Sequence, residues 1–260
     1  MTSRYLFVGG LHRSGTSLLA QILAKHPDIA AIEDAPVPEN EGVYLQGAIP
    51  HTALMGVPGR FAFDEEQHLT EDSSFNTLST RDYLSAQWEP WFREGPGWRL
   101  EKSPVNLLRA RLYQQLFPTS QFIFVSRHPV AVTEATAKWC ADGRASLLEH
   151  WEQAHATLLA DLPYLHCWLI VRYEDLVSDA KTCLERIYSF LQLPFVEPNE
   201  TVASNLNDAY FDSWAFPSQM HPSDMKTARA FGYDIDPPAT SARPIPGGRH
   251  YFHSISEKIA

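Results

Sequence analysis

Residues 4–24 have the sequence RYLFVGGLHRSGTSLLAQILA, and this stretch decides the fold. Its apolar run at 5–8 suits a buried strand, and a polar, glycine-containing segment at 9–16 follows. Leucine and isoleucine then recur at helical spacing between residues 18 and 23. A strand, a loop and a helix in this order are typical of a phosphate-binding site, because loop amides and the helix N-terminus both favour an anion.

The side chains of this loop suit an anion as well. Gly15 lets the backbone approach a ligand, while Ser14, Thr16 and Ser17 offer hydroxyl donors and Arg13 a fixed cation. We therefore expect these five residues to bind the anion. The alternative is a strand–turn–helix whose turn is rich in Gly and Ser by chance.

The spacing of the loop is close to that of a Walker A motif, with one difference. Four residues separate Gly10 from Gly15 and Ser17 ends the motif, but Thr16 replaces the lysine. Kinases and NTPases use that lysine on the phosphates of a nucleoside triphosphate, beside magnesium. The loop therefore favours a different anion.

The Arg-Ser-Gly-Thr-Ser string at 13–17 resembles the 5′-phosphosulfate loop of sulfotransferases, which use 3′-phosphoadenosine 5′-phosphosulfate (PAPS) as donor. It is most similar to the bacterial and tyrosylprotein members. The resemblance implies in-line transfer of a sulfuryl group from PAPS to an acceptor hydroxyl or amine, with no metal. It also implies that Arg13 stabilises the phosphosulfate oxygens.

Composition narrows the class of protein. The chain has 260 residues, which suits a single sulfotransferase domain over 1–260. Its net charge of −10 disfavours a general binder of nucleic acid or anionic membrane. Cys140, Cys167 and Cys183 form no CxxC pair, and no apolar run approaches 18 residues. We expect a soluble cytoplasmic protein without a leader or a membrane span.

An acidic pair follows the second expected strand at 29–32. Glu33 and Asp34 would then lie in the crevice at the carboxyl ends of the strands. In tyrosylprotein sulfotransferases a similar His-Pro, short strand and acidic pair follow the loop, and the resemblance implies that the second acid, Asp34, is the catalytic base. The alternatives left open are a simple turn cap, or a base at Glu33, Glu39, Glu41 or His51.

Residues 35–97 are the least regular third of the chain. Prolines and glycines divide this segment into loops, and residues 81–93 predict a helix that bends or ends near Pro90. Long irregular segments of compact domains are usually binding loops or lids, so we expect acceptor-side loops here. Its aromatic residues could line an acceptor pocket or pack in the core: Tyr44, Phe61, Phe63, Trp88, Trp91 and Phe92.

Lys102 ends the strand expected at 98–102. Ser103 is predicted to cap the following helix and Pro104 to be its first residue. Sulfotransferases carry a similar Lys-x-Pro element, and the resemblance implies that Lys102 steadies the bridging oxygen of the donor as its S–O bond breaks. The alternative is a surface lysine at a helix start, where the helix dipole disfavours it.

Arg127 ends the apolar strand expected at 121–126, and a helix is predicted from 130 to 139. The resemblance implies that Arg127 holds the 3′-phosphate of the donor together with a hydroxyl eight residues later. That position is Ala135, so Thr136 is the expected partner, with Thr133 also near. An arginine that caps the sheet is the alternative.

The remaining pattern continues the alternation of strands and helices. A helix at 146–162, a strand at 167–171 and a helix from a Ser178 cap to Leu191 are expected. The string at 172–176, Arg-Tyr-Glu-Asp-Leu, is interpreted as structural. Beyond it come a helix at 225–231, whose Arg229 is a weak candidate for the donor's 3′-phosphate, and a Pro/Gly-rich tail at 237–260.

These elements predict a three-layer α/β, P-loop-like sulfotransferase fold, with a mostly parallel sheet and helices on both faces. The acceptor is left open among a small molecule, a lipid, a sugar and a peptide. Two rival functions also stay open, a P-loop nucleotide kinase and a non-catalytic nucleotide-binding protein. Thr16 in the lysine position argues against the first, and Ala135 leaves the second open.

Overall fold

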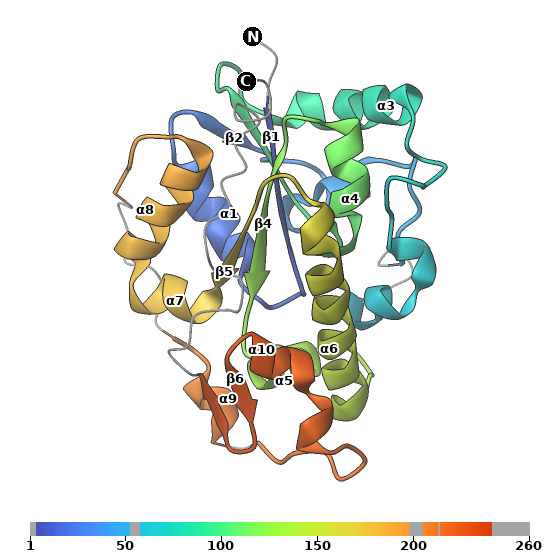
Figure 1. Ribbon diagram of the computed structural model, residues 1–260. Helices are drawn as coiled ribbons and strands as arrows, with labels where there is room; N and C mark the ends of the chain where they lie inside the picture. Colours follow the sequence, from blue (N-terminus) through green and yellow to red (C-terminus); the bar gives the residue numbers. More distant parts are fainter. Residues whose placement is uncertain (1–3, 53–57, 198–204, 213, 241–260) are drawn as a thin grey trace.

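Five parallel strands form the centre of the computed structural model, which describes residues 4–52, 58–197, 205–212 and 214–240 (Figure 1). The sheet order is β2-β3-β1-β4-β5, and every neighbouring pair is parallel. The strands are β1 (Arg4–Gly10), β2 (Ile29–Ala31), β3 (Trp98–Lys102), β4 (Gln121–Ser126) and β5 (Trp168–Arg172).

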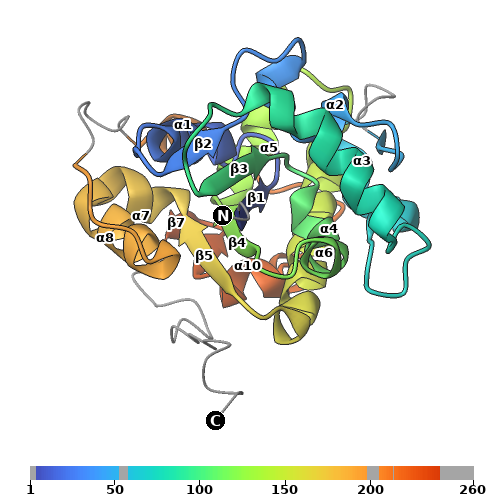
Figure 2. The same ribbon diagram turned by 90° about the horizontal axis from the view of Figure 1, so that it is seen from above.

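Helices cover both faces of this sheet. Tyr5 and Phe7 of β1 face one hydrophobic core, while Leu6 and Val8 face the other. The first core is covered by α3 (Leu78–Trp88), α4 (Asn106–Leu116) and α6 (Arg144–Asp161), and the second by α1 (Thr16–Ala24), α7 (Tyr173–Ser178) and α8 (Ala180–Leu191) (Figures 1 and 2). The predicted three-layer α/β fold is confirmed.

Parallel pairing brings the carboxyl ends of the strands to one edge of the sheet. Val8 pairs with Lys102, and Gly10 pairs with Val125. The loop after β1 therefore lies between the ends of β3 and β4, where Lys102 and Arg127 stand. β2 and β3 lie on one side of β1, whereas β4 and β5 lie on the other side. This edge of the sheet therefore has two distinct halves.

The segment 35–97 contains several short helices besides α3. Much of it packs on the first core: Trp88 and Phe61 are fully buried, and Phe92 is nearly so. Its helix ends at Trp88, just before Pro90, as expected. The short elements are η1 (Pro38–Asn40), α2 (Gly42–Leu45), η3 (Pro58–Phe63), η4 (Glu65–Gln67) and η5 (Glu89–Trp91).

Two predicted helix caps are wrong, and these helices begin two residues and one residue later than expected. α4 begins at Asn106, because the Ser103 hydroxyl is engaged by neighbouring chain segments instead of capping it. α8 is capped by Asp179, whose carboxylate accepts from the Thr182 amide at 3.1 Å, whereas Ser178 ends the short α7. The Asp179 carboxylate reaches the Thr182 amide, which has no partner within the helix at the first turn of α8. α5 (Pro129–Thr136) also ends three residues earlier than expected.

Residues 205–212 and 214–240 form small elements, of which α10 and the residues just after it pack on the middle of α6. Gly232 follows α10 with φ 83°, which matches the predicted helix end. The expected tail begins with a strand that pairs antiparallel with β6, and residues 241–260 lie outside the described part. None of the described helices is long and apolar enough to span a bilayer. The remaining elements are η6 (Leu162–Tyr164), α9 (Asp208–Phe211), η7 (Pro222–Asp224), α10 (Lys226–Ala230), β6 (Tyr233–Ile235) and β7 (Pro238–Thr240).

Candidate functional site

The loop between β1 and α1 is tightly packed around two glycines. Gly15 has φ 100° and precedes α1, and a Cβ there would lie 2.9 Å from the Tyr173 ring. A Cβ on Gly10 would lie 2.4 Å from the carbonyl oxygen of Val125. No side chain caps the first turn of α1. Its amide groups are therefore available to an anion at the helix N-terminus.

The side chains of this loop have different positions. Ser14 is buried and its hydroxyl donates to the Leu11 carbonyl oxygen at 2.6 Å, so it stabilises the loop itself. Thr16 is buried in the first turn, whereas Arg13 is exposed and adopts a left-handed backbone with φ 67°. The carbonyl oxygen of Arg13 accepts a hydrogen bond from Arg127 at 3.0 Å. The loop is thereby joined to the end of β4.

Lys102 and Glu41 form a buried ion pair at the end of β3. The Lys102 Nζ donates to Glu41 Oε1 at 3.0 Å, and the side chains are only 5% and 6% exposed. Burial raises the pKa of Glu41 to about 7, although the neighbouring Lys102 charge opposes the rise. Glu41 is thus a carboxyl group that titrates near neutral pH beside a cation.

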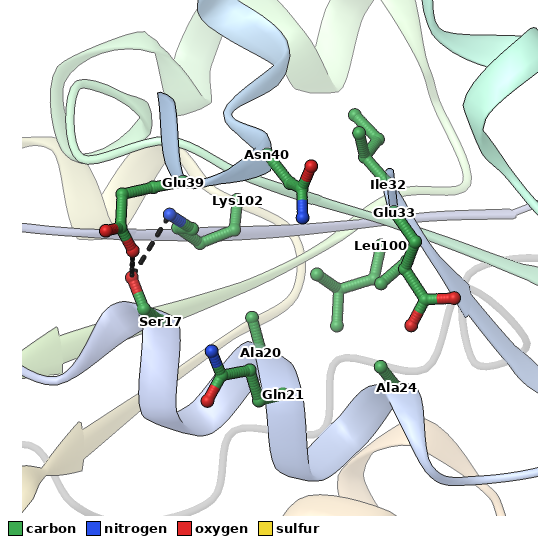
Figure 3. Close-up of a pocket in the computed structure, with 11 residues that line it drawn as sticks. Ser17, Ala20, Gln21, Ala24, Ile32, Glu33, Glu39, Asn40, Leu100 and Lys102 are labelled. Atoms are coloured by element: carbon green, nitrogen blue, oxygen red, sulfur yellow. Dashed lines mark hydrogen bonds between the residues drawn. The ribbon is translucent and has the colours of Figure 1, made fainter. Parts of the chain in front are cut away.

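Ser17 extends this pair toward solvent. Lys102 Nζ also donates to Ser17 Oγ at 3.2 Å, and Ser17 Oγ donates to Glu39 Oε2 at 3.1 Å (Figure 3). Ser17 stands in the first turn of α1, so one hydroxyl connects the phosphate loop with the candidate catalytic pair. The sequence predicts Ser17 and Lys102 as separate site residues, and the structure brings them together.

A buried network places Glu41 beside Lys102. Glu101 Oε1 accepts from the Gly42 amide at 3.0 Å and from the Ser103 hydroxyl at 2.5 Å. The Ser103 oxygen in turn accepts from the Val43 amide at 3.1 Å. These bonds fix the backbone directly after Glu41. Burial raises the pKa of Glu101, and its hydrogen bonds oppose the rise. No sequence motif marks this network, because the two segments that it joins are about 60 residues apart.

Asp34 lies apart from this pair. It is exposed, has φ 53° and forms no hydrogen bond or ion pair with the part of the chain that the structure describes. Glu33 is also exposed and lines a pocket beside α1. His51 is buried, and burial lowers its pKa to about 4, so it is neutral at pH 7. Among the candidate bases, Glu41 is the one in contact with Lys102.

Arg127 is a buried cation with an unfilled donor. Its Nε donates to Asn207 Oδ1 at 2.8 Å, its Nη1 donates to the Arg13 carbonyl oxygen, and its guanidinium lies 4.2 Å from the centre of the Tyr173 ring. Its Nη2 has no hydrogen-bond partner among the described residues, and no described carboxylate forms an ion pair with it. Buried guanidinium groups are usually paired, so this geometry fits an anionic ligand.

Thr136, the hydroxyl predicted to assist Arg127, lies in α5 next to a small cavity. Thr136 and Thr133 line a small cavity with His12 and His150, between the phosphate loop and α6. No described hydrogen bond links either threonine to Arg127. Asn207 and the ring of Tyr210 lie near the guanidinium instead, and sequence reasoning missed both. They come from a segment about 80 residues later, where no motif marks them.

The string at 172–176 has the structural role that the sequence suggests. Arg172 pairs with Asp175 at 2.9 Å. Glu174 accepts hydrogen bonds from the amide of His128, from Asn207 and from the Tyr233 hydroxyl. It therefore ties β5 to the start of α5 and to the β6 strand, and it holds Asn207 against Arg127. Arg229, in contrast, is exposed and donates to backbone carbonyls of η7.

Solved structures of sulfotransferases have a fold similar to that of this chain. The sulfotransferase domain of the olefin synthase from Synechococcus PCC 7002 has a TM-score of 0.59 and 22% identity, covering 90% of this chain and 97% of that one. A sulfotransferase from Alicyclobacillus acidocaldarius has a TM-score of 0.52 and 14% identity, covering 80% and 88%. At these identities the likeness is one of fold, and it agrees with the P-loop-like prediction.

Sequence comparison points the same way. The chain is 24% identical over 204 residues to a protein-tyrosine sulfotransferase of Drosophila melanogaster, a match that covers 73% of this chain. It spans only 38% of that relative's length. The profile of the sulfotransferase family matches residues 6–197, from β1 to just beyond α8. The chain belongs to the sulfotransferase family.

Proposed function

We propose that this protein transfers a sulfuryl group from PAPS to a hydroxyl or amine of an acceptor. The observation that carries the proposal is the buried Lys102–Glu41 pair, joined through Ser17 to the first turn of α1. A cation that can stabilise a leaving oxygen and a carboxylate with a pKa of about 7 lie next to a phosphate-type loop. Family membership supports the same reaction class.

The residues at the end of β4 fit the nucleotide part of the donor. Arg127 is buried, and its Nη2 lacks a partner among the described residues. A guanidinium in this state suits the 3′-phosphate, since it can donate to two oxygens at once. The first turn of α1 and the exposed Arg13 would then receive the 5′-phosphosulfate. This arrangement directs the sulfuryl group toward Ser17 and Lys102.

The proposed reaction balances without a further reactant. The acceptor oxygen or nitrogen forms a bond to sulfur, while the bond from sulfur to the bridging oxygen of the 5′-phosphate breaks. Lys102 stabilises the charge that develops on this oxygen, and the acceptor proton passes to the ionised Glu41. The sulfated acceptor and 3′-phosphoadenosine 5′-phosphate leave. Positioning and fixed charges supply the catalysis.

We assign the base to Glu41 in preference to Asp34. Glu41 contacts Lys102 and has a raised pKa, as a base that works near neutral pH requires. Asp34 is exposed and contacts neither Lys102 nor Ser17. The family resemblance favours Asp34 as the base. We propose that Glu41, seven residues later, has this role instead.

Calorimetry tests the donor. We expect 3′-phosphoadenosine 5′-phosphate to bind with micromolar affinity and ATP with magnesium not to bind. Turnover of sulfur-labelled PAPS with a panel of sugars, phenols, lipids and tyrosine peptides then tests the transfer. Preference for ATP with magnesium would favour a kinase-like function, and donor binding without turnover on any acceptor would favour a non-catalytic nucleotide-binding protein.

A further inference from the structure

A pocket with about 550 Å³ of space, part of it open to solvent, begins at Lys102 and Ser17 and runs beside α1. It extends along α1 from Ser17 to Ala24, seven residues, which corresponds to about 10 Å of helix. It lies over β2 and β3, on the opposite side of β1 from Arg127 and β4. The pocket is therefore placed to hold an acceptor whose reacting group reaches Lys102, while the nucleotide occupies the other half of the edge.

The lining of this pocket combines carboxylate and amide side chains with apolar ones. Glu33 and Glu39 contribute carboxylates, and Gln21 and Asn40 contribute side-chain amides (Figure 3). Lys102 is the lining cation, and Glu41 already neutralises it. None of the described residues that line the pocket is aromatic.

We infer that this pocket binds an acceptor that carries a protonated amine on a hydroxyl-rich scaffold, of the amino-sugar type. The inference rests on the proposed function. Carboxylates favour an ammonium group, and side-chain amides both donate to and accept from hydroxyls. Trp88 and Phe61, two aromatic residues that could have stacked on a phenol, lie in the core instead.

The chemistry assigns an orientation to this acceptor. The hydroxyl to be sulfated lies at the Lys102 end, where its proton passes to Glu41 and its oxygen takes the sulfuryl group as the donor's S–O bond breaks. The ammonium group lies toward Glu33, at the other end of the pocket (Figure 3). The Glu39 carboxylate already accepts a hydrogen bond from Ser17, so we assign the ammonium group to the Glu33 carboxylate.

Two probes of similar size test the inference by direct calorimetric binding: kanamycin A, which carries amines, and maltotriose, which is neutral. We expect wild type to bind kanamycin A at least tenfold more tightly. Glu33→Gln should weaken its binding roughly 3-fold, and Glu33→Gln with Glu39→Gln roughly tenfold, as for exposed charge pairs. Glu185→Gln, an exposed carboxylate on α8, is the matched control and should change nothing.

The two failures can be told apart. Equal binding of the two probes, or kanamycin A binding that is the same in wild type and the double variant, overturns the amine subsite even when 3′-phosphoadenosine 5′-phosphate binds. Failure to bind this nucleotide overturns the proposed function, while the direct kanamycin A measurement still decides the subsite. Labelled turnover with kanamycin A and PAPS, lost in Glu41→Gln, would support both.

Discussion

Two buried cations stand at the ends of β3 and β4, the strands on either side of β1, and they are held in opposite ways. Lys102, at the end of β3, has a buried carboxylate as its partner. Arg127, after β4, is held by an amide oxygen, a backbone carbonyl and an aromatic ring, and one of its nitrogens lacks a partner among the described residues. Lys102 has its counter-charge in direct contact, whereas Arg127 forms no ion pair with a carboxylate of the described residues.

The difference separates binding from chemistry. An unbalanced buried guanidinium gains most when a phosphate arrives, so Arg127 should determine donor affinity. A lysine already paired with a carboxylate contributes less to ground-state binding. The Lys102–Glu41 pair should therefore act mainly in the transition state, when the leaving oxygen becomes charged and the acceptor loses its proton.

The largest expected effect is that of Glu41→Gln. The amide cannot take a proton, so turnover should fall about 10²- to 10⁴-fold, as for loss of a general base. In wild type, turnover should decline as the pH falls below about 7, because protonation removes the base. We expect this acidic limb to be absent from the residual activity of the variant. An unchanged pH profile would remove Glu41 from the mechanism.

Lys102→Ala should reduce turnover about 10²-fold or more, because the charge on the leaving oxygen loses its stabilising cation. Lys102 lowers the pKa of Glu41, so its removal should also shift the acidic limb to higher pH. Binding of 3′-phosphoadenosine 5′-phosphate should change far less than turnover. Lys181→Ala, which removes an exposed lysine of α8, serves as control. A larger loss in nucleotide affinity than in turnover would break the proposed separation.

Arg127→Ala should weaken binding of 3′-phosphoadenosine 5′-phosphate roughly 10- to 100-fold, the usual worth of a hydrogen bond to a charged group. Adenosine 5′-phosphate, which lacks the 3′-phosphate, should lose much less. Arg127→Lys keeps the charge but not the planar fork, so it should restore binding only in part. Arg186→Ala on the exposed face of α8 is the control. Equal losses for the two nucleotides would move the 3′-phosphate away from Arg127.

The smallest effect is expected for Asp34→Asn. Asp34 is exposed and has φ 53°, a conformation that asparagine also tolerates. Turnover should stay within about twofold of wild type, as for a surface substitution away from the site. A loss as large as that of Glu41→Gln would return the base to Asp34 and end the role assigned to Glu41.

The fold was largely predictable because its signals are local. The run at 5–8, the leucines of α1 and the strand at 98–102 each show the period of the element they form, and the structure confirms them. Lys102 and Arg127 could be placed at one edge for the same reason, since parallel strands end together. The aromatic residues of the 35–97 segment were ambiguous, because burial of Trp88 or Phe61 depends on packing against distant helices.

The arrangement of the site was harder to predict because its contacts are long-range. Glu41 was one of several candidate bases, and only the fold brings it to Lys102, 61 residues away. Thr136 is predicted as the partner of Arg127 because it follows Ala135, the position eight residues after this arginine. In the fold, Thr136 lines a small cavity together with His12 and His150. Asn207 reaches Arg127 across 80 residues from a segment without regular periodicity.

Gly42 leaves no room for a side chain, since a Cβ there would lie 2.6 Å from the Glu101 side chain. Together with the Ser103 bond to Val43, this contact anchors the chain immediately after the proposed base. Any side chain at position 42 would therefore push the segment that carries the proposed base away from the strand that carries Lys102. For protein engineering, residues 41–43 are therefore positions to leave unchanged when the lining of the proposed acceptor pocket is redesigned.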